Sequence, residues 1–371
     1  KQLTVLKKLI KQASTIIHAG DPDREGQLLV DEVIEQVKLS QAKKQQIQRL
    51  LISDLNLSAV KKALNNLKSN RDFIPLSVSA LARSRADWLF GMNLTRAYTL
   101  AGQKAGFGNV LSVGRVQTPI LGLVVNRDNE IANFVAKPFY EVLAHLETEQ
   151  QQTFSAKWQP SKACEPYQDE EGRVLHRGLA ENVVSRITNQ PAKVVELEQK
   201  QKKQQAPLPS NLSALQIDAA KAFSMPAQKV LDTCQSLYER HKLITYPRSD
   251  NRYLPKDHHK DAASIIAAIA NNEGQAIEAC KQADSSKRSK CFNDSKVAAH
   301  HAIVPTEKQL RSASLNSDEQ KIYRLICRHY LIQLYPGYLF NETKITVEIA
   351  GGLFKAAAKQ DVSLGFKILM G

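Results

Sequence analysis

The sequence of 371 residues has few cysteines and no long apolar run. Its five cysteines are odd in number, scattered along the chain, and never form a Cys-x-x-Cys pair. This distribution is typical of a reducing compartment, and it argues against a zinc site. Because no stretch of about 18 apolar residues is present, no membrane-spanning segment is expected. We therefore expect a cytoplasmic protein without a membrane partner.

Acidic residues are fewer than basic residues in this sequence. The 37 Asp and Glu residues stand against 51 Lys and Arg, which gives a net charge of +14. This excess favours partners with phosphate backbones or anionic surfaces, although an unspecialised basic surface has the same composition. The length suffices for about two to four domains. The chain begins at Lys1 and ends at Gly371 without a terminal signal, so we expect a fragment of a longer protein.

An acidic loop follows the first predicted strand. Residues 14–19 are typical of a buried strand, and residues 28–34 have a helical pattern. Such a unit belongs to a parallel α/β fold, in which ligands bind at the carboxyl end of the strand. Asp21, Asp23 and Glu25 alternate in the loop, and three nearby carboxylates favour a hard divalent cation, Mg²⁺ rather than zinc. Alternatively, Asp21 and Asp23 only stabilise the N-terminus of the following helix.

A basic helix is expected from about Leu76 to Leu94. Arg83 and Asp87 are four residues apart, which predicts an ion pair within the helix. Trp88 suits either a core position or a surface on which a base stacks. Arginines on or just beyond this segment are candidates for phosphate contacts, namely Arg83, Arg85 and Arg96.

A polar turn at residues 111–117 precedes a further helix. Thr118 and Pro119 have the pattern of an N-cap and a first helical residue. The apolar spacing beyond them predicts a buried stripe made of Ile120, Leu123, Val124 and Ile131. Polar residues just before a helix N-terminus are a natural seat for phosphate, and those here are Ser112, Arg115 and Gln117. The simpler alternative is that Gly114 only makes a tight turn.

The middle of the chain changes from helical to alternating patterns. Residues 139–198 predict a β-rich module, and similar alternation returns from residue 341. We interpret the polar, proline-punctuated residues 199–210 as a hinge or interdomain connection. Helices are predicted over residues 213–223, 227–240 and 318–334, and the second has an apolar stripe that includes Leu237 and Tyr238.

A phenol and a guanidinium lie two residues apart in the segment 243–250. The hydroxyl of Tyr246 can attack a phosphodiester, and Arg248 can reach the oxygens that carry the developing charge. By itself the pattern is more often that of a surface turn. His300 and His301 precede an Ile-Val-Pro-Thr turn, where a histidine can donate to a phosphate or move a proton, although such pairs are often uncommitted.

Four motifs, taken together, resemble the type IA DNA topoisomerases, and within them the topoisomerase III group. They are Asp21-Pro22-Asp23-Arg24-Glu25-Gly26, Ser112-Val113-Gly114-Arg115-Val116-Gln117-Thr118-Pro119, Ile244-Thr245-Tyr246-Pro247-Arg248-Ser249-Asp250 and His300-His301-Ala302-Ile303-Val304-Pro305-Thr306. They occur in the family's order, and the resemblance covers essentially the whole chain. It implies a partial toroidal fold of α/β and α+β domains. The implied domains are a partial Toprim α/β domain (1–74), a helical DNA-binding domain (75–138), the first part of a β-rich arch (139–207), a winged-helix-like domain carrying the tyrosine (208–340) and a truncated return to the arch (341–371).

The resemblance implies an ATP-independent DNA topoisomerase. Tyr246 would be the nucleophile, forming a 5′-phosphotyrosyl link to single-stranded DNA and freeing a 3′-hydroxyl. Arg248 would stabilise the transition state, and His300 would hold the phosphate region of the cleaved strand. Strand passage and religation would then relax negative supercoils or decatenate DNA. The acidic residues Asp21, Asp23 and Glu25 would hold Mg²⁺ or assist proton transfer.

The expected partners are single-stranded DNA and negatively supercoiled or catenated duplex DNA, bound by a monomer associated with the nucleoid. DNA contacts are expected from Arg83, Arg85, Trp88, Arg96, Ser112, Val113, Gly114, Arg115, Val116, Gln117 and Arg248. Because the family's Glu-Lys-Pro segment does not precede Asp21, we expect an incomplete Toprim domain and poor relaxation of supercoils by the fragment. Two alternatives are another Toprim phosphotransferase, such as a nuclease or primase, and a non-catalytic fragment that binds single-stranded DNA.

Overall fold

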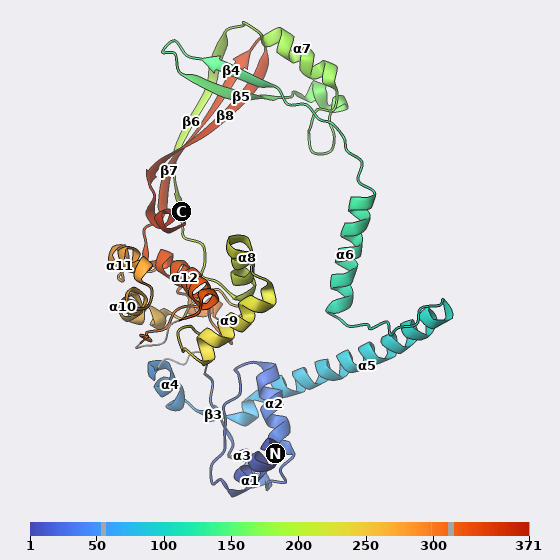
Figure 1. Ribbon diagram of the computed structural model, residues 1–371, viewed down its shortest axis with the longest axis vertical. Helices are drawn as coiled ribbons and strands as arrows, with labels where there is room; N and C mark the ends of the chain where they lie inside the picture. The colour runs from blue at the N-terminus through green and yellow to red at the C-terminus, as the bar shows by residue number, and fades with distance from the viewer. Residues whose placement is uncertain (53–56, 298, 311–314, 371) are drawn as a thin grey trace. The chain divides into compact units, whose positions relative to one another are not determined.

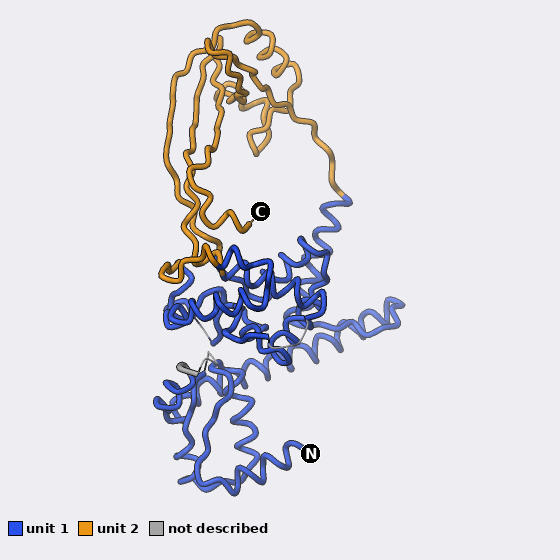
Figure 2. The backbone as a smooth tube through the Cα atoms, turned by 60° about the vertical axis from the view of Figure 1, so that its left-hand side comes forward, with its two compact units in different colours: residues 1–132, 208–280, 290–330 blue, residues 133–207, 281–289, 331–371 orange. Residues whose placement is uncertain are grey.

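The computed structural model describes residues 1–371 apart from 53–56, 298, 311–314 and 371 (Figure 1). The chain forms two compact units, coloured blue and orange in Figure 2. Unit 1 contains Lys1–Ala132, Leu208–Cys280 and Lys290–Tyr330, and unit 2 contains Asn133–Pro207, Lys281–Ser289 and Leu331–Gly371. All candidate site residues lie in unit 1. Among the described residues, no helix has both the length and the apolar character needed to cross a membrane.

Unit 1 begins with a small α/β fold. Strands β1 (Ile17–His18) and β2 (Gln48–Arg49) are parallel, and β3 (Lys68–Ser69) is antiparallel to β2. Helix α2 (Arg24–Glu35) follows the acidic loop, which confirms the predicted order of strand, loop and helix. The other helices of this part are α1 (Gln2–Gln12), α3 (Gln41–Gln45) and α4 (Leu57–Leu64).

The predicted basic helix is confirmed and is longer than its pattern indicated. Helix α5 spans Ile74–Lys104, 31 residues, with Pro75 in the first turn, where no intrahelical hydrogen bond is lost. Most of it is exposed, and only Ala80 is buried. Amphipathic spacing is weak along this helix because polar and apolar residues alternate around its whole circumference.

Two predictions for the next helix, α6 (Gln117–Ala132), are wrong. Thr118 is not the N-cap, because the helix already includes Gln117, and the Thr118 hydroxyl instead accepts from the Gly114 N–H at 3.0 Å. The predicted stripe is not buried: Ile120, Leu123, Val124 and Ile131 are 55%, 70%, 51% and 61% exposed. No part of the described chain covers this face. Apolar spacing identifies such a face but not what packs against it.

The rest of unit 1 is a helical domain. Its helices are α8 (Leu212–Phe223), α9 (Ala227–Glu239), α10 (Ala262–Asn272) and α12 (Ser317–Leu331), with α11 (Ile277–Gln282) after α10 along the chain. Their apolar stripes supply fully buried residues such as Leu215, Val230, Leu237 and Ile322. The helices predicted at 213–223, 227–240 and 318–334 are confirmed, although residues 332–334 form a 3-10 turn.

Unit 2 is built on a five-stranded antiparallel sheet in the order β4-β5-β8-β7-β6 (Figure 1). The strands are β4 (Leu143–Glu147), β5 (Thr153–Gln159), β6 (Ala192–Gln204), β7 (Tyr338–Ile349) and β8 (Gly352–Ser363). Helix α7 (Arg177–Ile187) packs on a core that includes Trp158 and Phe354. Because β7 and β8 lie between β5 and β6, the predicted return of the C-terminal residues to the β-rich module is confirmed.

The hinge predicted at residues 199–210 is wrong for its first half. Residues 199–204 belong to β6, and each pairs with a residue of β7, from Gln199 with Thr343 to Gln204 with Tyr338. Nearly every side chain of β6 is exposed. A strand that has solvent on both faces needs no apolar alternation, and its composition is therefore that of a loop.

A buried histidine joins α12 to the segment before α8. His329 Nδ1 lies 2.6 Å from the Ser210 hydroxyl, and His329 Nε2 lies 3.7 Å from a carboxylate oxygen of Asp218. Ser210 is buried and its backbone carbonyl accepts from the Ile303 N–H at 2.9 Å. Burial lowers the pKa of His329 to about 4, and the nearby Asp218 carboxylate only partly opposes this shift. The imidazole is therefore neutral at pH 7.

We expect this histidine to make folding stability depend on pH. The unfolded chain binds the proton with a pKa of about 6.5, above the folded value, so acid favours unfolding. The contribution of His329 to the free energy of unfolding should be fully present above about pH 6.5. It should fall by up to about 3 kcal/mol as the pH decreases to about 4. Urea denaturation at several pH values would measure this slope. The slope should be smaller in His329→Gln and unchanged in His145→Gln, which alters an exposed histidine; equal slopes in both variants would contradict the assignment.

Candidate active site

The segment that carries Tyr246 is positioned by a sharp turn after α9. Lys242 adopts a left-handed conformation with φ of 58°, and it turns the chain away from the helix. The next two residues, Leu243 and Ile244, are buried. Backbone hydrogen bonds then join this segment to the histidine motif: Thr245 N–H donates to the Val304 carbonyl and Thr306 N–H donates to the Leu243 carbonyl. Two motifs about sixty residues apart are thus joined by an isolated antiparallel β-bridge between Ile244 and Pro305.

This pairing brings Tyr246 and His300 together. Their ring centroids are 4.4 Å apart with an interplanar angle of 34°. A second tyrosine, Tyr238 on α9, meets the Tyr246 ring nearly at a right angle, with centroids 5.9 Å apart. Tyr246 is half-buried, whereas Arg248 is exposed to solvent two residues further on. The phenol is therefore held by its ring, close to an accessible cation.

The acidic loop also reaches this histidine. A carboxylate oxygen of Asp21 lies 4.0 Å from His300 Nε2, and 61% of the Asp21 side chain is exposed. Asp23 has a different role, because its carboxylate accepts from the Gly26 N–H at 2.7 Å and caps α2. The capping alternative considered for the two aspartates thus describes Asp23.

The third acidic residue, Glu25, contacts two arginines. Its Oε1 accepts from Arg24 Nε at 2.9 Å and from Arg83 Nη1, on α5, at 2.6 Å. The hydrogen bond from Arg24, together with the charges of Arg24 and Arg83, lowers the pKa of Glu25. Arg83 was also expected to pair with Asp87. That prediction is wrong, because Asp87 accepts from Arg115 Nε at 2.6 Å and Arg83 bonds to Glu25.

The three carboxylates do not gather into a metal site. Asp23 is bonded to the helix N-terminus and Glu25 to arginines, which leaves Asp21 on the side of His300. In the part of the chain that the structure describes, no cluster of three or more Asp, Glu, His or Cys side chains is arranged to hold a metal ion. In this arrangement the acidic motif does not fit a magnesium site with three carboxylate ligands.

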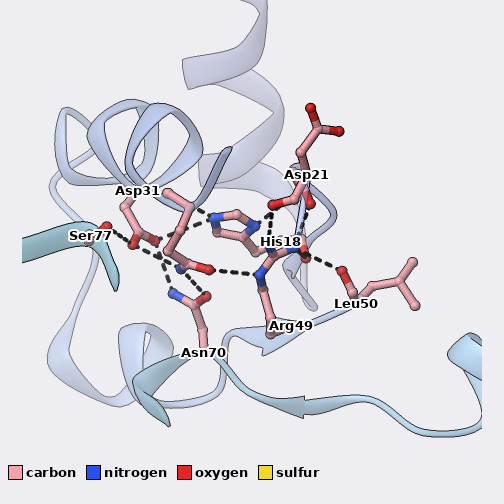
Figure 3. A network of polar contacts seen from close by, with 9 residues as sticks. His18, Asp21, Asp31, Arg49, Leu50, Asn70 and Ser77 are labelled. Carbon is pink, nitrogen blue, oxygen red and sulfur yellow. Dashed lines mark hydrogen bonds and ion pairs between the residues drawn. The ribbon is translucent and has the colours of Figure 1, made fainter. Parts of the chain in front are cut away.

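A buried arginine holds the backbone of the acidic loop (Figure 3). The Arg49 side chain is fully buried, and its Nη1 donates to the carbonyls of His18, Gly20 and Leu50 at 3.3, 2.7 and 2.8 Å. Its Nη2 donates to the Asp21 carbonyl at 2.7 Å. Burial lowers the pKa of Arg49, whereas the carboxylates of Asp31, Asp21 and Asp23 raise it. Carbonyl dipoles therefore stabilise this cation where water is excluded.

Further polar contacts orient this arginine. Arg49 Nε donates to Gln27 Oε1 at 2.7 Å, and the Gln27 amide nitrogen donates to Asp31 at 2.9 Å. Asp31 also accepts from Asn70 and from Ser77, which is on α5. The carboxylate of Asp31 thus fixes the orientation of the Gln27 amide, and that amide fixes the guanidinium. A chain of hydrogen bonds therefore runs from the start of α5 to the acidic loop.

Apart from Arg248, the predicted DNA contacts lie along α5 and in the turn that leads into α6. Trp88 is 64% exposed, and Arg85 and Arg96 are also exposed. The turn is held to α5 by the Val113 N–H, which donates to Thr95 Oγ1 at 3.0 Å. Within the turn, the Gln117 amide donates to the Ser112 hydroxyl at 2.7 Å. A hollow of about 710 Å³ lies between the two elements, lined by Asp87, Gly91, Val113, Gly114, Arg115, Val116, Gln117, Ile120, Leu121 and Val124.

Comparison with known proteins identifies the family. The profile described as DNA topoisomerase matches residues 72–371, and the Toprim domain matches residues 1–55. The chain belongs to the type IA DNA topoisomerases. The family and fold class predicted from the four motifs are confirmed.

The relatives of this topoisomerase chain are named DNA topoisomerase 3. The Vibrio cholerae protein is 60% identical over 374 residues, a match that covers 100% of this chain and 58% of the relative. The Salmonella typhimurium protein is 55% identical over 371 residues, covering 100% of this chain and 57% of the relative. The chain thus spans a little under three-fifths of the length of these relatives.

A solved structure shares the fold. Full-length topoisomerase I from Thermotoga maritima matches with a TM-score of 0.67 and 22% sequence identity, covering 100% of this chain and 57% of that one. At this level of identity the likeness concerns the fold alone.

Sequence patterns missed several residues of this topoisomerase site. Arg49 lies in β2, and a charged residue in a buried strand position is a signal that buried partners must exist. Which partners it has depends on α2 and α5, so spacing alone does not name Gln27 or Asp31. Tyr238 belongs to the apolar stripe of α9, and nothing in that stripe distinguishes a core residue from a neighbour of Tyr246.

We predict that Arg49→Lys lowers the free energy of unfolding by about 3 kcal/mol or more, because a lysine ammonium cannot reach five spread acceptors and leaves buried carbonyls without donors. Urea denaturation would measure the change. The matched control is Arg71→Lys, an exposed arginine of the same α/β part, which should change stability little. Similar small losses in both variants would show that the buried guanidinium has no special role.

Proposed function

We propose that the protein is an ATP-independent DNA topoisomerase in which Tyr246 cleaves one DNA strand. The main observation in support is the ring contact between Tyr246 and His300, with the Asp21 carboxylate 4.0 Å from His300 Nε2. A phenol, an imidazole and a carboxylate from three distant segments meet at one place. Membership of the type IA family supports the same assignment.

The chemistry is a transfer of a phosphoryl group between two hydroxyls. The Tyr246 oxygen attacks the phosphorus of a phosphodiester, the bond from phosphorus to the 3′-oxygen breaks, and that oxygen leaves as a hydroxyl after taking up a proton. The 5′-phosphate stays on the tyrosine, so the energy of the ester bond is conserved. Attack by the 3′-hydroxyl reverses the step, and no ATP is needed.

Three residues around the phenol have proposed roles. Arg248 is exposed two residues from Tyr246 and would neutralise charge on the phosphate oxygens in the transition state. His300 would orient the phenol through its ring contact and donate to the phosphate. Among the acidic residues, Asp21 is the one beside His300, so this arrangement favours Asp21 over Glu25 as a partner in proton transfer.

No step of this mechanism is assigned to a metal ion. Mg²⁺ would use Asp21, Asp23 and Glu25, and two of these carboxylates are bonded elsewhere in the described arrangement. Ligation by all three would require Asp23 to leave the cap of α2 and Glu25 to leave Arg83.

We propose single-stranded DNA as the direct substrate, within negatively supercoiled or catenated duplex DNA. The exposed Trp88, with Arg85 and Arg96 on the same helix, offers a stacking surface and two phosphate contacts. The Ser112 to Gln117 turn is held against this helix and adds further donors. We propose that the protein acts as a monomer in the cytoplasm, in association with the nucleoid.

We expect Tyr246→Phe to abolish the covalent adduct, because phenylalanine keeps the ring contacts and lacks the attacking oxygen. The assay mixes the protein with a 3′-labelled single-stranded oligonucleotide and stops the reaction with denaturant, so the labelled 5′-phosphate fragment stays on the protein. Binding, measured by fluorescence anisotropy, should be unchanged. Tyr253→Phe, which alters a nearby tyrosine, should still form the adduct. An adduct that persists in Tyr246→Phe would show that another residue is the nucleophile.

A further inference from the structure

Tyr238 is a second aromatic neighbour of the proposed nucleophile. It lies in the last turn of α9, one residue before Glu239, at which the helix ends. Its ring meets the Tyr246 ring at 82°, with centroids 5.9 Å apart, an edge-to-face arrangement that aromatic pairs prefer. The His300 ring contacts Tyr246 at a tilt of 34°. The Tyr246 ring is therefore contacted from two different orientations.

The helix that carries Tyr238 is firmly attached to the core. The neighbouring Leu237 is fully buried. The Ser236 hydroxyl donates to Glu319 Oε1 at 2.7 Å, and His241 Nε2 lies 3.2 Å from the same buried oxygen. Tyr238 therefore presents its ring from a helix that is anchored in the core.

The surroundings of Tyr238 also keep its hydroxyl protonated. Burial raises the pKa of Tyr238, and the nearby Tyr246 and Asp21 add to this effect. The ammonium of Lys242 lies 5.7 Å from the centre of the Tyr238 ring, a cation–π contact that further fixes the ring. A phenol that is harder to deprotonate than an ordinary tyrosine is a poorer nucleophile, so the residue can support Tyr246 without replacing it.

We propose that Tyr238 is a positioning residue that, together with His300, fixes the direction in which the Tyr246 hydroxyl points. The side chain of a tyrosine has several staggered rotamers, and each places the hydroxyl in a different position. In-line attack on phosphorus accepts a narrow range of positions, so a restrained ring raises the fraction of productive encounters. This role rests on the proposed function, in which Tyr246 is the nucleophile.

A first experiment observes the Tyr246 ring directly, without any reaction. The protein is labelled with 3-fluorotyrosine, and the fluorine resonance that disappears in Tyr246→Phe is assigned to Tyr246. We expect Tyr238→Leu to shift and broaden this resonance, because the ring contact is lost. The matched control is Phe223→Leu, which removes a different aromatic ring that also has a lysine ammonium over it, 5.9 Å from its centre. An unshifted resonance in Tyr238→Leu, or the same shift in Phe223→Leu, would overturn the proposal.

A second experiment measures single-turnover formation of the covalent adduct with the 3′-labelled oligonucleotide. Tyr238→Leu should slow adduct formation roughly two- to ten-fold, the range expected for loss of one aromatic pair, without weakening DNA binding. Tyr238→Phe keeps the ring and should react at nearly the original rate. An unchanged rate in Tyr238→Leu overturns the positioning role alone. Absence of an adduct in the unmodified protein overturns the proposed function first, so the two failures are distinguishable.

Discussion

The buried guanidinium of Arg49 is the interaction on which the geometry of the acidic loop depends. Four backbone carbonyls and the Gln27 amide oxygen surround it, and three of those carbonyls belong to the strand and loop that carry Asp21. A cation in a fully buried position is stable only if all its donors are used, so the loop has little freedom to move independently of β2. Through Gln27 and Asp31 the same constraint extends to Ser77 at the start of α5.

Long-range pairing produces the other half of the site. Tyr246 and His300 are far apart in sequence, and they meet because the backbone of residues 243–245 bonds to that of residues 304–306. The loop with Asp21 adds the carboxylate beside His300. Each of the three segments contributes at least one functional group, and none of them could form the site alone. This division explains why each motif has little meaning by itself and why their common order identifies the family.

Residue types and local periodicity predicted the helices and the α/β start, whereas only the resemblance of the four motifs to the family implied that Tyr246 and His300 share a site. Predictions failed where the answer depended on a distant neighbour. The Arg83 guanidinium bonds to Glu25 across the fold although Asp87 lies one turn away on the same helix. The apolar face of α6 has the spacing of a buried stripe, but spacing does not supply a partner. Asp23 caps a helix, although its spacing from Asp21 and Glu25 suits a metal. Local patterns describe what a side chain can do, and the fold selects among those uses.

The polar composition of β6, which is that of a linker, also bears on how the exposed edge of this strand can interact with other chains. In the described sheet β6 is an edge strand of 13 residues, so one row of its backbone donors and acceptors has no strand beside it. Such an edge is a template on which a second chain can add a strand and begin to aggregate. The strand carries Lys193, Lys200, Lys202 and Lys203, and charged side chains, lysine above all, are a common means of blunting such an edge. The lysines that give this segment the composition of a linker are therefore also the residue type that suits an ordered edge strand.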